Sequence, residues 1–143
     1  MTPRSDAEFE AERIGSPSRA HRIDLRRTLY SFRHAGRGFA WAFSSQANVR
    51  VHLVAAAAVM VGAVLLRFSV IELVALVLCF AIVITAELFN TTLEVLIDYA
   101  WPEHHPMIGR AKDVAAAAVL VAAVGAAFVG IMLFARHIFF HLS

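Results

Sequence analysis

Three apolar segments decide what this chain can fold into. They cover about residues 53–66, 68–86 and 114–135. A transmembrane helix needs about 20 mostly apolar residues, and only helices and closed barrels pair every backbone polar group inside a bilayer. The chain is 59% hydrophobic, whereas an ordinary soluble domain has about 45–50% apolar residues. We therefore expect an all-α membrane protein with three transmembrane helices.

The region before the first apolar segment has two parts. Residues 1–22 are polar and mixed in charge, which predicts a disordered tail ahead of a membrane domain at 23–143. From Asp24, a plausible N-cap, apolar residues such as Leu25, Leu29 and Phe32 recur every three or four positions among arginines. This pattern predicts an amphipathic basic helix at about 24–46, lying in the membrane interface. The alternative is a helix that packs in a soluble bundle. We expect the spans at about 51–66, 68–88 and 113–135.

The basic residues indicate the topology. Nine of the 13 Lys and Arg residues precede Val51, and Arg110 and Lys112 follow the second span. The positive-inside rule then places the N-terminus and the second loop in the cytoplasm and the turn at Arg67 outside. We expect a multi-pass protein of the cytoplasmic (inner) membrane. The chain contains no basic motif interleaved with aromatic residues, the pattern that would indicate nucleic-acid binding. Its single cysteine, Cys79, provides no disulfide framework.

A row of polar residues closes the second apolar segment. At about 100° per residue, Asn90, Glu94 and Asp98 fall within about 60° of Glu87 on a helix. Charges at bilayer depth are costly and usually functional. Carboxylate and amide oxygens suit Mg²⁺, which also binds phosphate oxygens. The chain re-enters the membrane near Lys112, its sole lysine, so Lys112 is expected at the same level as this row.

Two chemistries fit this row. A phosphoryl-transfer site would use Lys112 and Arg50 on phosphates and a carboxylate to take the proton of a lipid hydroxyl. An oligomeric ion channel or transporter would use the same acids as a pathway. The chain has no G-x-x-x-x-G-K-[ST] loop, so a kinase would not be of the P-loop type. Trp41 and Trp101 are expected in the interfacial aromatic belt.

These residues resemble the small prokaryotic diacylglycerol kinase and undecaprenol kinase family of integral membrane lipid kinases. The similarity rests on ELFNTTLEVLID at 87–98, EHHP at 103–106 and AKDVAAAAVL at 111–120. Residues 31–38 and 48–52 also look like the family, and the similarity covers about residues 27–135.

The resemblance implies a homotrimer with active sites shared between subunits, and transfer of the γ-phosphoryl group of ATP to a lipid alcohol. Glu87 matches the catalytic base, and Glu94 matches an acid that binds Mg²⁺ beside the nucleotide. We assign Asn48, Arg50 and Glu87 to the lipid substrate. The positions that match nucleotide-site residues are Arg27, His34, Asn90, Glu94, Glu103, His105, Lys112 and Asp113.

Two positions depart from the family pattern. Gln46 stands where the family has its second metal-binding acid, so the predicted metal site loses one charge. His34 stands where the family has a nucleotide-site tyrosine. An inactive family member is therefore an open alternative. Asn48 and His52 look more like the undecaprenol kinase branch than the diacylglycerol kinase branch.

Overall fold

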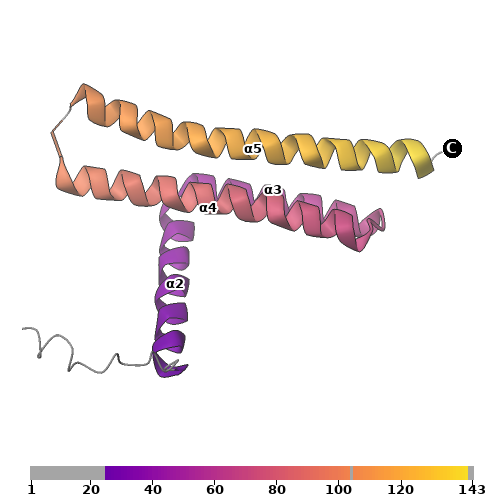
Figure 1. The fold of residues 1–143 in the computed structure, drawn as a ribbon, viewed down its shortest axis with the longest axis horizontal. Coiled ribbons are helices and arrows are strands. Elements are labelled where there is room, and N and C mark those ends of the chain that lie inside the picture. The colour runs from indigo at the N-terminus through magenta and orange to yellow at the C-terminus, as the bar shows by residue number, and fades with distance from the viewer. Residues whose placement is uncertain (1–24, 104, 142–143) are drawn as a thin grey trace, which may run out of the picture. The chain divides into compact units, whose positions relative to one another are not determined.

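The computed structural model describes residues 25–103 and 105–141. These residues form four helices, α2 (Leu25–Ser45), α3 (Ala47–Leu65), α4 (Val70–Ala100) and α5 (Pro106–His141) (Figure 1). The described ranges contain no β-strand, so the predicted all-α fold class is confirmed. The predicted disordered tail and the proposed cap at Asp24 lie outside the described residues. The chain divides into two units, Met1–Gly36 and Arg37–Ser143.

Helices α3, α4 and α5 are each long and apolar enough to cross a membrane. The helices extend beyond the predicted spans, because α4 continues to Ala100 and α5 already begins at Pro106. The acid row therefore lies on regular helix along its whole length. Which part of each helix crosses the bilayer stays a prediction.

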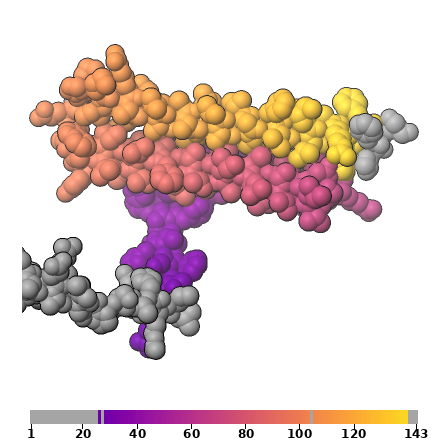
Figure 2. All heavy atoms as spheres, viewed as in Figure 1, coloured from indigo at the N-terminus to yellow at the C-terminus, as the bar shows by residue number. Residues whose placement is uncertain are grey.

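Helix α4 packs against both α3 and α5 (Figure 1). A tight link at 66–69 joins α3 to α4, and Arg67 in this link has a φ of 59°. Helix α5 runs back along α4, and Figure 2 shows the side chains of these two helices meeting along their length. The second unit is thus two consecutive helical hairpins that share α4.

The hydrophobic core lies near the link between α3 and α4. Ala63, Phe68 and Leu76 are buried there. The ring of Phe68 lies 4.8 Å from that of Phe134 on α5, measured between centroids. Gly62 allows this approach, because a Cβ at this position would lie 3.2 Å from the Phe134 ring.

The start of α4 is fixed by a reciprocal cap. The Ser69 side chain accepts from the Glu72 backbone N–H, and the Ser69 backbone N–H donates to Glu72 Oε2 at 2.7 Å. A guanidinium nitrogen of Arg136 on α5 lies 3.7 Å from the other Glu72 oxygen. These partners stabilise an acid that is 9% exposed in an otherwise apolar helix.

Candidate active site

One face of α4 carries the polar residues that the sequence singles out. Glu87 is 2% exposed and Asn90 is 6% exposed, whereas Glu94 is half-buried and Asp98 is exposed. Burial therefore decreases toward the C-terminal end of α4. Thr91, 3% exposed, lies beside this row and was not among the predicted site residues. We call Glu87, Asn90, Glu94 and Asp98 the acid stripe.

Asn90 and Glu94 interact directly within the acid stripe. The Asn90 amide nitrogen donates to Glu94 Oε1 at 2.9 Å, as residues four apart on a helix can. The amide oxygen of Asn90 is buried and has no hydrogen-bond partner among the described residues. A buried acceptor without a partner is costly. This oxygen is therefore an acceptor that the described part of a single chain leaves unsatisfied.

Lys112 joins the stripe from α5. Its ammonium forms an ion pair with the Asp98 carboxylate across the gap between α4 and α5. Asp113 follows on α5 and is exposed. The two helices thus bring a cation to the exposed end of the stripe, although 14 positions separate Asp98 from Lys112.

The predicted residues around the start of α3 have different surroundings. Gln46 precedes α3, is half-buried, and makes no side-chain capping hydrogen bond. Asn48 is exposed. The Arg50 guanidinium donates to the carbonyl oxygens of Phe43 and Ser44, each at 3.0 Å. Arg50 therefore caps the C-terminal end of α2, a contact that the assignment to substrate did not include.

Two predicted residues belong to the first unit. His34 is exposed on α2. The side chain of Arg27 lies outside the described part of the chain. Their assignment to the nucleotide remains a prediction.

An open pocket of about 750 Å³ lies at the connection between α4 and α5. Its polar lining includes the predicted Glu103 and His105. His105 Nδ1 accepts from the Met107 backbone N–H at 3.2 Å, so His105 caps α5 directly before Pro106. Trp101 also lines this pocket. We call it the loop pocket.

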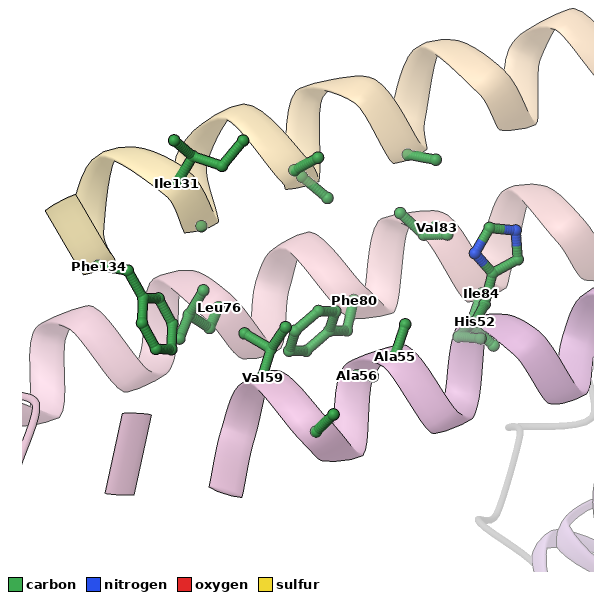
Figure 3. Close-up of a pocket in the computed structure, with 15 residues that line it drawn as sticks. His52, Ala55, Ala56, Val59, Leu76, Phe80, Val83, Ile84, Ile131 and Phe134 are labelled. Atoms are coloured by element: carbon green, nitrogen blue, oxygen red, sulfur yellow. The ribbon is translucent and has the colours of Figure 1, made fainter. Parts of the chain in front are cut away.

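An apolar groove of about 550 Å³ runs between α3, α4 and α5. From α4 it is lined by Leu76, Phe80, Val83 and Ile84 (Figure 3). Glu87 follows one helical turn after Val83, so the groove and the acid stripe occupy one continuous face of α4. The His52 ring lies near Ile84 and Val83 at this end of the groove (Figure 3).

The donor set decides which metal could bind. Among the described residues, no three His, Cys, Asp or Glu side chains gather in one chain to hold a metal ion. The stripe does provide the Glu94 carboxylate and the partnerless Asn90 amide oxygen. Such a small all-oxygen set does not form a protein cage. It fits Mg²⁺, which keeps waters and binds substrate phosphates together with one or two carboxylates.

Comparison with known proteins decides the family. The family model of prokaryotic diacylglycerol kinase matches residues 33–134, which is more than half of the chain. The chain belongs to this family. The predicted family is therefore confirmed, and so is the predicted enzyme class, a lipid kinase.

Individual relatives of this prokaryotic diacylglycerol kinase family member carry two names. The chain is 38% identical over 117 residues to an undecaprenol kinase of Bacillus subtilis, covering 82% of this chain and 95% of the relative. It is 41% identical to a diacylglycerol kinase of Synechocystis, covering 71% of this chain and 59% of that relative. A diacylglycerol kinase of Escherichia coli K12 is 31% identical and covers 70% of this chain and 86% of the relative.

Sequence reasoning missed several features that the structure reveals. Thr91 falls within about 40° of Glu87 on the helical wheel, so the spacing alone would have included it. Ser69-x-x-Glu72 before an apolar run is a capping-box signature. The groove carries no such local signal, because it forms only when three helices meet.

Proposed function

We propose that this family member transfers the γ-phosphoryl group of ATP to the hydroxyl of a membrane lipid alcohol, at the cytoplasmic surface of the inner membrane. One observation carries the proposal. A single face of α4 presents an apolar groove and then, one turn later, the acid stripe that begins at Glu87. A lipid alcohol has the matching order of parts, an apolar chain followed by a hydroxyl.

Glu87 is the proposed base. Its carboxylate takes the proton from the lipid hydroxyl, and the lipid oxygen bonds to the γ-phosphorus. The bond from that phosphorus to the bridging oxygen breaks, giving ADP and the lipid phosphate, and Glu87 then loses its proton to water. The side chain is 2% exposed at the end of the groove, which keeps bulk water from competing as the acceptor.

The rest of the stripe would hold the phosphates. Lys112, which pairs with Asp98 in this structure, can donate its three N–H bonds to phosphate oxygens. Glu94 and the Asn90 amide oxygen are the proposed Mg²⁺ ligands, and Gln46 can add a neutral oxygen. When bound, Mg²⁺ would neutralise charge that develops on the transferred group.

The proposed acceptor is undecaprenol or diacylglycerol. The undecaprenol kinase of Bacillus subtilis matches this chain over 95% of its own length, which favours undecaprenol. The groove is lined mainly by alanine and other apolar side chains, in keeping with a hydrocarbon chain as its occupant.

The proposed assembly is a homotrimer with its N-terminus in the cytoplasm. One chain gathers too few ligands among its described residues to hold a metal ion, so a site completed by a neighbouring subunit suits the chemistry. The excess of arginines before Val51 supports the orientation.

A lipid phosphorylation assay tests the proposal. Purified full-length protein is given labelled ATP, Mg²⁺ and mixed micelles that contain either undecaprenol or diacylglycerol. We expect phosphate on at least one lipid. Replacing Glu87 with Gln should reduce the rate about 10²–10⁴-fold, the usual contribution of a general base.

The matched control is Glu72→Gln, which changes the other buried acid of α4 far from the stripe. This variant should keep the wild-type turnover number for the lipid. Phosphate on neither lipid would refute the kinase proposal. Full activity of the Glu87→Gln protein would refute the role of Glu87.

A further inference from the structure

Arg67 has a backbone conformation that helix ends usually reserve for glycine. It lies in the link after α3 and has a φ of 59°. Its backbone N–H donates to the Val64 carbonyl, and the Phe68 N–H donates to the Ala63 carbonyl, each at 3.0 Å. These two bonds form a Schellman motif, in which the left-handed residue is most often Gly. An arginine there carries a steric cost that Gly would not, which points to a role for its side chain.

The Arg67 guanidinium is exposed and forms no hydrogen bond or ion pair with the residues that the structure describes. A second exposed guanidinium belongs to Arg136 on α5. The rings of Phe68 and His137, their chain neighbours, lie 4.4 Å apart between centroids. Figure 1 shows the link after α3 and the C-terminal part of α5 at the same end of the helices. We call Arg67 and Arg136 the arginine pair.

Glu72 balances only part of the charge of the arginine pair. Its Oε2 accepts from the backbone N–H and the hydroxyl of Ser69, each at 2.7 Å. Arg136 lies 3.7 Å from Glu72 Oε1, which is longer than a hydrogen bond, and its side chain is 70% exposed. Two arginines face one acid, so this end of the second unit keeps an excess of positive charge.

The arginine pair lies beside an exposed apolar surface, far from the acid stripe. Leu65, Val70 and Ile71 are 75%, 76% and 82% exposed. At about 1.5 Å per residue, Glu72 lies roughly 39 Å along α4 from Asp98. A bilayer with its headgroups is about 40–45 Å thick. When the exposed end of the acid stripe lies at one membrane surface, the arginine pair therefore lies at the headgroups of the other.

We propose that the arginine pair binds the phosphate of an anionic phospholipid at this second surface. A guanidinium can donate two parallel N–H bonds to phosphate oxygens. The neighbouring exposed apolar side chains favour a phospholipid over a free phosphate ion, because acyl chains would cover them below the bound headgroup. The proposed lipid site is separate from the acid stripe and does not depend on the kinase proposal.

Quenching by brominated lipids tests the proposal with the full-length protein in vesicles. Trp41 and Trp101, the only two tryptophans, are replaced with Phe, and Ile71→Trp puts a reporter on the exposed surface beside Glu72. The measurement compares the affinity of brominated phosphatidylglycerol at the reporter with that of brominated phosphatidylcholine. We expect phosphatidylglycerol to bind about 5- to 30-fold more tightly, the range for one or two arginines at a charged lipid surface. A ratio near one would overturn the proposal.

Arg67→Gly is the sharpest variant in this reporter protein, because Gly is the residue that a φ of 59° favours. We expect the preference for phosphatidylglycerol to fall about fivefold, while the midpoint of thermal unfolding stays equal or rises. Adding Arg136→Gln should remove the preference. The control Arg110→Gln removes an exposed arginine near the other end of α5 and should leave the preference unchanged. An unchanged preference in Arg67→Gly would overturn the proposal, and a lower midpoint would then assign Arg67 to the dipole of α3.

Inorganic phosphate distinguishes a lipid headgroup from a free ion. It should lower the preference for phosphatidylglycerol no more than sodium chloride does at the same ionic strength, since both salts then act by screening. A larger effect of phosphate would assign the arginine pair to a soluble ion and overturn the lipid site. Lipid phosphorylation is not a readout in this experiment, so failure of the kinase proposal would leave its result intact.

Discussion

At the scale of single residues, Asn90 links two parts of the proposed site. Its amide nitrogen orients Glu94, and its buried amide oxygen has no partner among the described residues. In the proposed site this oxygen is a ligand of Mg²⁺.

We predict that Asn90→Ala raises the Mg²⁺ concentration needed for half-maximal activity about 10- to 100-fold, as loss of a group that orients or supports a metal ligand does. The measurement is a Mg²⁺ titration of lipid phosphorylation. The control is Thr92→Ala, an exposed neighbour whose hydroxyl donates to the Leu88 carbonyl. A lower rate with an unchanged Mg²⁺ titration would show that Asn90 acts on the fold and not on the metal.

At the scale of elements, the two ends of α4 do different work. Its N-terminal end is fixed by Ser69, Glu72 and Arg136, which satisfy one another's polar groups. Its C-terminal end carries acids that α5 balances with a single lysine. Substitutions at the N-terminal end of α4 should therefore lower the stability of the protein, and substitutions at its C-terminal end should lower the activity.

The capping box gives a prediction about stability alone. Ser69→Ala removes the hydroxyl that accepts from the Glu72 backbone N–H and donates to Glu72 Oε2, and should cost about 1 kcal/mol of unfolding free energy. The measurement is the midpoint of thermal inactivation in micelles, with turnover recorded below that midpoint. Ser44→Ala, which removes an exposed hydroxyl from the last turn of α2, should not shift the midpoint. A large loss of turnover at unchanged stability would contradict this division of α4.

At the scale of the whole second unit, three regions follow one another along α4. The apolar groove comes first, the acid stripe follows, and the loop pocket lies beyond Asp98. The order matches an acceptor chain, a reacting centre and a donor nucleotide. Substitutions in the groove should therefore change the lipid concentration for half-maximal rate and leave the KM for ATP unchanged.

Filling the groove tests this order. Ala126 lines it from α5, and Ala126→Phe should raise the lipid concentration for half-maximal rate about tenfold or more, because overpacking costs about 1–3 kcal/mol. The KM for ATP should stay within twofold. Val121→Phe places the same ring at an exposed position of α5 that does not line the groove, and should change neither value. Equal effects of Ala126→Phe on both substrates would indicate general distortion.

The sequence alone determined the helices, the three membrane-length segments and the placement of Glu87, Asn90, Glu94 and Asp98 on one face. These properties depend on hydrophobicity and on a local period of 3.6 residues, so they can be read without any partner segment. The tertiary structure decided the Lys112–Asp98 pair, the use of Arg50 on the end of α2, and the groove between three helices. Each of these needs segments whose approach depends on how the helices pack, and spacing along one helix carries no information about that approach.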